Sequence, residues 1–346
     1  MRWLDPRFRP LGARAGRRRR RVTPELCVVV ASHDRPLRLR WLLNALADQT
    51  LAHERWELVV AHDSAGPETA VLLAGHPLAR AGVLRTLTFA PGAGPAEKRN
   101  AAWRASAAPT VVFTDDDCRP PAEWLAQTLA AVRARPGAIV QGATRPDPDE
   151  LALVAVAGWR SQEIAPPVTW AQTCNIAYPR DALEAVDGFD DTLPEAAGED
   201  TDLALRARAT GVPYTGAPAM LTFHCIEVPG LPARVRDSQR WRHMAAVVAR
   251  HPSLRRNFPL RVFWKRRHAL LGPALLGLGL GVTRPRRNVL ALALVVPWAR
   301  LAAPSYGPGA RGRLRALSEL PVNALVDCAE VAALVRGSIH HRSPLL

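Results

Sequence analysis

The amino-acid sequence predicts an α/β fold: a mainly parallel sheet with helices on both faces, followed by a C-terminal helical region. Between residues 26 and 141, short apolar runs alternate with segments of helical periodicity, which is typical of strands joined by helical crossovers. The runs are apolar throughout, which is typical of strands buried on both faces. The chain has 346 residues, 48% of them hydrophobic, so it can bury a large core.

The predicted elements of the first half follow one another at short intervals. Continuous apolar runs predict strands over 26–31, 56–61, 84–89, 110–114 and 138–141. Helical spacing, such as that of the leucines at 39, 42, 43 and 46, predicts helices over 38–49, 95–105 and 121–133. After residue 142 the pattern is less regular. The elements expected there are a strand over 174–178 and helices over 200–210 and 232–250.

Two apolar blocks, 269–282 and 289–299, lie in the last third of the chain. Each is shorter than the roughly 20 residues of a transmembrane helix. Treating both as one span would bury Arg284, Arg286 and Arg287 in lipid, at a cost of roughly 3 kcal/mol each. Two interpretations therefore stay open: interfacial helices or a re-entrant hairpin at a membrane, or a buried pair packed on the preceding domain.

The charge of the chain indicates its partners and compartment. The net charge of +15 predicts anionic partners such as nucleotide phosphates or an anionic membrane surface. Nucleic acid is not expected, because no zinc-finger, basic-zipper or RNA-binding motif accompanies the charge. The five cysteines are scattered and form no C-x-x-C pair, which favours a reducing compartment. The basic segment 1–24 has no apolar stretch after it and predicts a disordered tail rather than a secretory signal.

Three carboxylates, Asp115, Asp116 and Asp117, follow directly after the apolar run over 110–114. Neighbouring like charges repel, and a divalent cation removes that cost because hard cations prefer carboxylate oxygens. Ligands of open α/β sheets bind beyond the carboxyl ends of the strands, which is where these residues are expected. The sequence therefore predicts a metal site that holds a phosphorylated ligand in a group-transfer enzyme.

Further motifs share the order and spacing of one enzyme family. They are Val28 to Pro36, Asp63-Ser64, Lys98-Arg99-Asn100, Asp115 to Asp117, Gly188-Phe189-Asp190 and Gly198 to Leu203. Over roughly residues 26–225 the chain therefore resembles family 2 of the glycosyltransferases. The resemblance implies a Rossmann-like GT-A fold, a nucleotide-diphosphate sugar donor, a divalent metal (Mn²⁺ or Mg²⁺) and transfer with inversion at the anomeric carbon.

The resemblance also implies roles for individual residues. The donor would be bound by Ser32, Arg35, Asp63, Arg99, Asn100, Asp115 and Asp116. The metal would be bound by Asp117, Asp115 and His224. Asp200 would be the general base that takes the proton of the acceptor hydroxyl, and Glu199 would position the acceptor or the base. Trp124 and Trp159 are interpreted as core or acceptor-lining residues.

The chain also departs from the family. Ala31 and His62 stand where relatives often have proline and aspartate, and the mechanism requires neither. Gln239-Arg240-Trp241 lacks the Q-x-x-R-W spacing of processive members, which counts against a polymerising synthase. The arginines at 234, 236, 240 and 242 either hold a diphosphate or lipid phosphate or lie on a solvated helix face.

We therefore expect three segments: a disordered basic tail over 1–24, a GT-A catalytic domain over 25–228 and a helical, membrane-tending region over 229–346. The expected function is metal-assisted transfer of a single sugar to a hydroxyl acceptor, by direct displacement. The acceptor would be a lipid-linked glycan, a cell-envelope polysaccharide precursor or a small molecule. The enzyme would be cytoplasmic and peripheral at the inner face of the cell membrane.

Three alternatives were weighed against this interpretation. A sugar-nucleotide pyrophosphorylase has a similar nucleotide fold, but it opens with a Gly-rich loop where this chain has Ser32 to Pro36. A non-catalytic nucleotide-sugar-binding protein that keeps the fold would be favoured by loss of Asp117 or Asp200, and both are present. A basic nucleic-acid or membrane adaptor would bind with strong salt dependence and would not turn over a donor.

Overall fold

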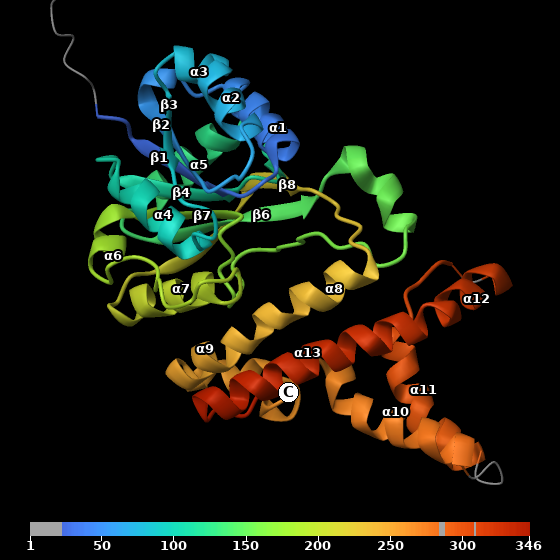
Figure 1. Cartoon of the computed structure of the whole chain (residues 1–346). Helices are drawn as coiled ribbons and strands as arrows, with labels where there is room; N and C mark the ends of the chain where they lie inside the picture. Colours follow the sequence, from blue (N-terminus) through green and yellow to red (C-terminus); the bar gives the residue numbers. More distant parts are fainter. Residues whose placement is uncertain (1–22, 284–287, 308) are drawn as a thin grey trace, which may run out of the picture.

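The computed structural model describes residues 23–283, 288–307 and 309–346. Most of the predicted tail over 1–24 lies outside these residues, as do Arg284, Arg286 and Arg287. Within the described residues, an eight-stranded sheet has the order β3-β2-β1-β4-β7-β6-β8-β5 (Figure 1). Its strands are β1 (Leu26–Ser32), β2 (Trp56–His62), β3 (Leu84–Thr88), β4 (Thr110–Asp115), β5 (Cys118–Arg119), β6 (Ile139–Pro146), β7 (Asn175–Pro179) and β8 (Tyr214–His224).

The two halves of the sheet differ in strand direction. The first half is parallel, since β1 pairs in parallel with β2 and β4, and β2 with β3. The second half is mixed: β7 runs antiparallel to both β4 and β6, β6 is parallel to β8, and β5 is antiparallel to β8. The predicted mainly parallel sheet therefore holds for β1 to β4. The strand next to β4 in the sheet is β7. It is antiparallel to β4, and an antiparallel pair needs no crossover connection.

Alternating side chains of the strands enter two separate cores. Leu26, Val28 and Val30 of β1 pack with α1 (Pro36–Ala47), α2 (Glu68–Gly75), α3 (Pro77–Arg80) and α5 (Trp124–Ala134). Cys27 and Val29 pack on the other face with α4 (Pro95–Arg104), α6 (Arg180–Glu184) and α7 (Glu199–Ala209). Period-two alternation along a strand produces such a division, and it confirms the prediction of helices on both faces.

The elements predicted in the first half are all present. The helix expected over 121–133 begins only at Trp124, and the strand expected over 138–141 extends to Pro146. The longest strand of the sheet, β8, was not predicted. It contains Gly216 and Pro218 and its exposure follows no simple alternation, so no pattern marks it in the sequence. Short 3₁₀ helices complete this part, η1 (His53–Arg55) and η2 (Pro148–Ala155).

The C-terminal region is helical, as expected, and lies below the sheet in the view of Figure 1. The single helix predicted over 232–250 is three segments in the structure. The elements are α8 (Leu231–Asp237), η3 (Ser238–His243), α9 (Met244–Arg250), η4 (Pro252–Asn257), η5 (Pro259–Arg261), α10 (Arg266–Thr283), α11 (Asn288–Ala302), α12 (Ala310–Ser318) and α13 (Leu320–His341). The long helix α13 was not predicted, and it contacts α8, η3, α9, α10 and α11.

The two apolar blocks form α10 and α11, which pack on each other as a hairpin (Figure 1). The base of the hairpin packs on α13 through Leu271, Ala274 and Trp298. Further from the base, apolar side chains such as Leu276 and Leu292 are exposed. The structure therefore contradicts a pair of core helices packed on the catalytic sheet. No described helix is both long and apolar enough to cross a membrane.

Candidate active site

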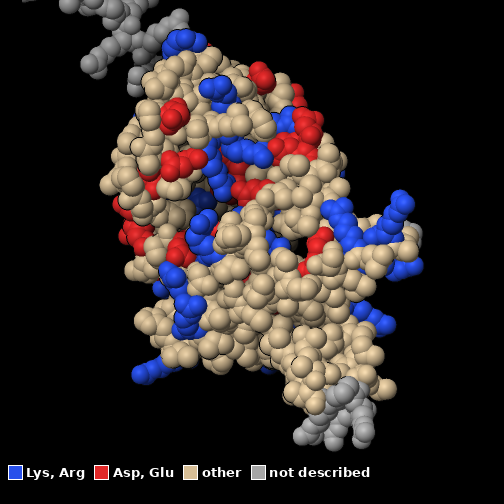
Figure 2. Space-filling view, turned by 45° about the vertical axis from the view of Figure 1, so that its right-hand side comes forward, with Lys and Arg blue, Asp and Glu red and all other residues tan. Residues whose placement is uncertain are grey.

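A cavity of about 660 Å³ lies at the carboxyl ends of β1, β2 and β4, between the sheet and the C-terminal region. Figure 2 shows acidic and basic side chains gathered around a hollow on this face of the molecule. Ten of the predicted site residues line the cavity: Ser32, Arg35, Asp63, Arg99, Asp115, Asp116, Asp117, Glu199, Asp200 and His224. The fold therefore brings together residues that lie up to 192 positions apart in the sequence, from Ser32 to His224.

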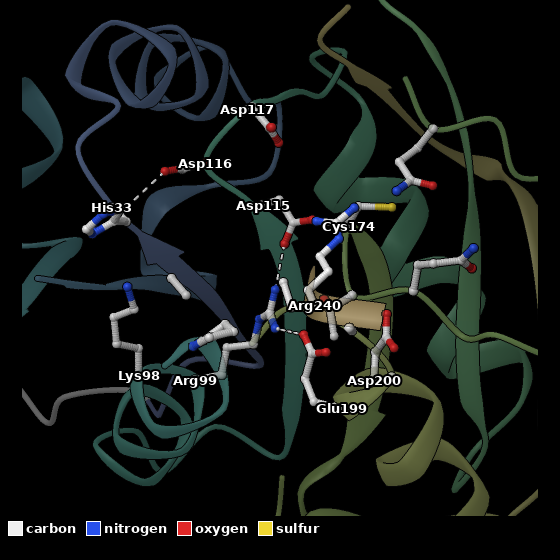
Figure 3. A pocket seen from close by; sticks show the side chains of 18 of the residues that line it. His33, Lys98, Arg99, Asp115, Asp116, Asp117, Cys174, Glu199, Asp200 and Arg240 are labelled. Carbon is white, nitrogen blue, oxygen red and sulfur yellow. Dashed lines mark hydrogen bonds and ion pairs between the residues drawn. The ribbon is translucent and has the colours of Figure 1, made fainter. Parts of the chain in front are cut away.

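The three consecutive acids point in different directions and have different partners (Figure 3). Asp115 ends β4 and pairs with Arg99 at 2.9 Å. Asp116 is buried and accepts a hydrogen bond from the Ser32 hydroxyl at 2.8 Å. Burial and the charge of Asp117 raise the pKa of Asp116 to about 7. The triplet is therefore not one shared chelating group, and Asp117 is the member to examine as a metal ligand.

Asp117 and His224 form the part of the cavity that fits a metal. Asp117 Oδ1 is buried and has no hydrogen-bond partner, and His224 Nε2 lies 3.5 Å from it. His224 Nδ1 lies 3.0 Å from the carbonyl oxygen of Cys225, to which it can donate. That hydrogen bond selects the tautomer with a bare Nε2, so two lone pairs face each other. A divalent cation between them would satisfy both atoms, with oxygen and imidazole ligands that suit Mn²⁺.

Two neighbours complete this group. The thiol of Cys225 lies near enough to be a third candidate ligand, but burial raises its pKa and it donates to Asp117 at 3.5 Å. Burial alone would raise the pKa of Asp117. In the absence of a metal, His224 in its protonated form and Arg35 outweigh burial and lower this pKa. Asp115, which was predicted as a second metal ligand, does not belong to this group, because its Oδ1 is paired with Arg99.

Glu199 and Asp200 form the first turn of α7, where a helix favours negative charge. Gly198 precedes them with a φ of 92°, and a Cβ there would lie 2.7 Å from the sulfur of Met244. Glycine therefore allows α7 to begin against α9. Burial and the charge of Glu199 raise the pKa of Asp200 to about 7. A carboxylate with this pKa in a cavity can accept a proton near neutral pH.

Arg99 links the acids of β4 to those of α7, which differs from its predicted role. Its guanidinium is buried and pairs with Asp115 and with Glu199, each at 2.9 Å (Figure 3). Two carboxylates of the protein therefore compensate the charge of this guanidinium and engage one N–H of each terminal nitrogen. The structure therefore gives Arg99 a positioning role: it holds Glu199, next to Asp200, at a fixed distance from the end of β4.

Asn100, which was predicted to bind the donor, lies outside the cavity. Its side-chain amide donates to the carbonyl oxygen of Phe189 and accepts from the backbone N–H of the same residue. It also accepts from the indole of Trp103 at 3.0 Å. Asn100 therefore connects α4 to the Gly188-Phe189-Asp190 segment, and these contacts hold α4 in place.

Asp63 lies at the end of the cavity formed by β1 and β2. It is buried and accepts hydrogen bonds from Lys98, from His33 at 3.0 Å and from the backbone N–H of Gly92 at 3.0 Å. Burial opposes its ionisation, but Lys98 and His33 outweigh burial and lower its pKa. The sequence analysis assigned no role to Lys98 or His33, although both stand inside the quoted motifs.

Arg35 extends from the loop after β1 to the acids at the end of β4 and lines the cavity. Its partners, however, are carboxylates of the protein: Asp117 at 2.6 Å, Glu227 at 3.0 Å and Asp116 at 3.6 Å. In this arrangement Arg35 compensates the charge of the acids. Glu227 was not predicted, because it follows β8, the strand that the sequence pattern does not reveal.

The C-terminal region supplies the remaining wall of the cavity, with Arg240, Trp241, Met244 and Trp264. Trp264 packs against Trp241 and Trp170, with ring centroids 5.1 and 5.4 Å apart. Of the two tryptophans predicted as core or acceptor-lining, Trp124 is a core residue, and Trp159 is neither in the core nor in the cavity wall. Trp124 is buried and donates to Asn175 at 2.9 Å, while Trp159 is partly exposed.

Known proteins resemble this chain in sequence and in fold. The sequence family described as "Glycosyl transferase family 2" matches residues 27–177. A validoxylamine A glucosyltransferase from Streptomyces hygroscopicus subsp. limoneus is 27% identical over an alignment of 225 positions, and the match covers 56% of this chain and 49% of the relative. The chain thus spans about half the length of the curated relative that it matches.

Among solved structures, a mannosyltransferase from Pyrobaculum calidifontis in complex with GDP-Man and Mn²⁺ superimposes with a TM-score of 0.56. The match covers 91% of this chain and 87% of the mannosyltransferase, at 18% identity, so it shows a similar fold. Residues 27–177, which are less than half of the chain, therefore match glycosyltransferase family 2, and the superposition shows that the chain has a GT-A-like fold.

Proposed function

We propose that this chain is an inverting glycosyltransferase that moves one sugar from a nucleotide-diphosphate sugar to a hydroxyl acceptor. One observation carries the proposal: a carboxylate with a pKa near 7, Asp200, shares a cavity with the bare carboxylate oxygen of Asp117. The first suits a general base and the second suits a metal that holds a diphosphate. The matched glucosyltransferase and mannosyltransferase support the same reaction class.

In the proposed reaction, Asp200 accepts the proton of the acceptor hydroxyl as its oxygen attacks the anomeric carbon. The bond from that carbon to the diphosphate oxygen breaks, and the nucleoside diphosphate leaves with the electron pair. Attack from the face opposite the leaving group inverts the anomeric carbon in a single displacement. Arg99 holds Glu199 by an ion pair, and Glu199 in turn keeps the neighbouring base, Asp200, in place.

Asp117 and His224 are the residues that would hold a divalent metal, Mn²⁺ or Mg²⁺. When bound, the metal would neutralise charge on the diphosphate of the leaving group. The complex of the mannosyltransferase with Mn²⁺ supports this choice of cofactor. Asp115 stays a candidate for contact with the donor, since its side chain is partly exposed to the cavity.

We also propose that the acceptor is a lipid-linked glycan or cell-envelope precursor and that the protein is cytoplasmic, at the inner face of the membrane. The hairpin of α10 and α11 supports this location, because Leu276, Val282, Val289 and Leu292 are each more than half exposed. Residues 269–318 contain seven arginines and no acidic residue. An apolar surface with cationic flanks fits an anionic lipid surface. Figure 2 shows this part of the molecule as a mostly uncharged projection.

The location can be tested by flotation of the full-length chain with vesicles. We expect binding to vesicles that contain phosphatidylserine and little binding to neutral phosphatidylcholine vesicles. The pair Leu276→Ser and Leu292→Ser should reduce binding, and Ile339→Ser, an exposed residue of α13 outside the hairpin, should not. Equal flotation of all variants would contradict the proposal.

The activity can be tested with UDP, GDP and TDP sugars in a thermal-shift screen, each with Mn²⁺, Mg²⁺ or EDTA. A donor that binds the native state raises the melting temperature. We expect a metal-dependent shift with one nucleotide, and Asp117→Asn should remove that shift. If the chain is instead a non-catalytic nucleotide-sugar-binding protein, a donor will bind but neither transfer nor donor hydrolysis will occur. An adaptor will show no donor shift at all.

A further inference from the structure

Five cationic side chains, from Arg and Lys residues, line the cavity, and four of them already have carboxylate partners. Lys98 pairs with Asp63, and Arg99 pairs with Asp115 and Glu199. The other two are Arg35, held by Asp117 and Glu227, and Arg160, held by Glu227 and Asp237 at 2.8 and 2.9 Å. These four cations organise the acids of the cavity and cannot turn to an anionic ligand without leaving a carboxylate unpaired.

The fifth, Arg240, has no such partner among the described residues. Its Nε is buried and makes no hydrogen bond, and no carboxylate lies within ion-pair distance of its guanidinium. Its described contact is with the ring of Trp241, 5.0 Å from the guanidinium carbon. Figure 3 shows its side chain among the residues of the cavity, near Asp115 and Asp200 in this view. Burial and the charge of Arg160 lower its pKa, which reflects the cost of the unpaired charge.

The surrounding helices keep Arg240 in this costly position. It lies in η3, which packs against α13. A Cβ at Gly337 of α13 would lie 2.0 Å from the carbonyl oxygen of Arg242, so only glycine allows the two backbones to approach this closely. A desolvated cation without a counter-ion destabilises a fold by several kcal/mol unless a ligand supplies the counter-charge.

We propose that Arg240 is the side chain that binds phosphate oxygens in this cavity and that its ligand is the diphosphate of the donor. The proposal rests on the function proposed above and assigns one residue to the leaving group. A guanidinium can donate two parallel hydrogen bonds to a phosphate. Because the diphosphate gains negative charge as its bond to the anomeric carbon breaks, Arg240 would stabilise the departing group more than the bound donor.

Binding of UDP and GDP, and of uridine and guanosine, can be measured by calorimetry on the full-length chain, in EDTA and in Mn²⁺. Arg240→Gln should weaken binding of the preferred nucleoside diphosphate about ten- to a hundredfold, the range for a hydrogen bond to a charged group. Binding of the nucleoside should not change. Arg240→Lys should restore part of the loss. Arg236→Gln, an exposed arginine one helical turn earlier, is the matched control and should have no effect.

The stability of the unligated protein gives an independent result. If Arg240 is a ligand-binding cation without a protein partner, Arg240→Gln should leave the melting temperature unchanged or raise it. A fall would assign Arg240 a structural role and overturn the proposal. Unchanged nucleoside-diphosphate binding in Arg240→Gln would also overturn it, and a raised acceptor KM in the same variant would place the phosphate on the acceptor instead. If the wild-type chain binds no nucleoside diphosphate, the proposed function itself fails.

Discussion

Two groups of side chains in this molecule pair a histidine with acidic residues, and they differ in what surrounds them. Asp117, His224 and Cys225 lie at the cavity, whereas His268, Asp327 and Glu330 lie between α10 and α13. In both groups the potential ligand atoms lie within 4.8 Å of one another. Proximity alone would therefore suggest two metal sites.

The neighbouring cations distinguish the two groups. Glu330 accepts from Lys265 and from His268, at 2.6 and 3.0 Å, and Arg267 lies 2.8 Å from Asp327. The acids between α10 and α13 are thus matched by cations of the protein. Asp327 Oδ1 and Asp117 Oδ1 are both buried and make no hydrogen bond, but Arg267 Nε lies 2.8 Å from Asp327 Oδ1, whereas the nearest partner of Asp117 Oδ1 is His224 Nε2 at 3.5 Å. Acids that lie close to arginine and lysine hold two helices together, while a carboxylate oxygen that faces a cavity and no arginine or lysine is available to a ligand.

The largest effect that tests this comparison is expected at the cavity. Asp200→Asn should lower kcat about 10²- to 10⁴-fold, the range for loss of a general base. Donor binding and the free energy of unfolding should change little, because Asp200 accepts hydrogen bonds only from its neighbour Thr201 among the described residues. Steady-state kinetics, calorimetric donor binding and urea unfolding check this. Near wild-type transfer by this variant would show that another residue is the base.

The group of His268, Asp327 and Glu330, here called the matched group, should respond in the opposite way. Glu330→Gln should lower the free energy of unfolding by about 3 kcal/mol, because it leaves Lys265 and Arg267 without their full counter-charge. Donor affinity measured on the folded variant should stay at the wild-type value. Urea unfolding and calorimetry give the two readouts, and a loss of donor binding with no loss of stability would reverse the assignment of the two groups.

The backbone contact between α13 and η3 should have a smaller effect. Gly337→Ala places a methyl group against the carbonyl oxygen of Arg242 and should destabilise the fold by about 1–3 kcal/mol. Because η3 carries Arg240, this variant should also weaken nucleoside-diphosphate binding. Gly272→Ala in α10, where a Cβ meets open space, is the control. It should not destabilise the fold, since alanine favours a helix more than glycine does, and it should leave nucleoside-diphosphate binding unchanged.

The smallest effects are pH dependences. At the cavity the pH dependence concerns activity, and in the matched group it concerns the free energy of unfolding. Since Asp200 acts as a base only when ionised, its pKa of about 7 predicts that kcat/KM rises with pH through about 7 and then levels off. A flat profile between pH 6 and 8 would contradict this assignment.

In the matched group, burial opposes ionisation of Glu330, but His268 and Lys265 outweigh burial and lower its pKa to about 2. The unfolded value is about 4.3, so this carboxylate stabilises the fold above about pH 4.3, and the contribution disappears as the pH falls toward 2. Acid unfolding of the wild type and of Glu330→Gln should therefore converge at low pH, and parallel curves would contradict this.

The sequence predicted much of the fold because buried strands and amphipathic helices have recognisable patterns of apolar residues. β1, β2 and β4 agree with their expected bounds to within one residue, as their apolar runs are short and continuous. β8 and α13 were missed for a physical reason. β8 contains glycine and proline and has mixed exposure, so its stability comes from pairing with β6 rather than from its own pattern.

The sequence alone determined the identities of the acids, their order and the family resemblance that they carry, because each motif is a short continuous stretch of the chain. Only the tertiary structure decided which partner each charge has. Arg99 was expected to bind phosphate, but it pairs with Glu199, 100 positions away. Arg240, for which the sequence left a phosphate-binding and a solvated position open, has no carboxylate partner among the described residues. Ion pairing depends on distances of a few ångströms between distant segments, and no local pattern in the sequence encodes those distances.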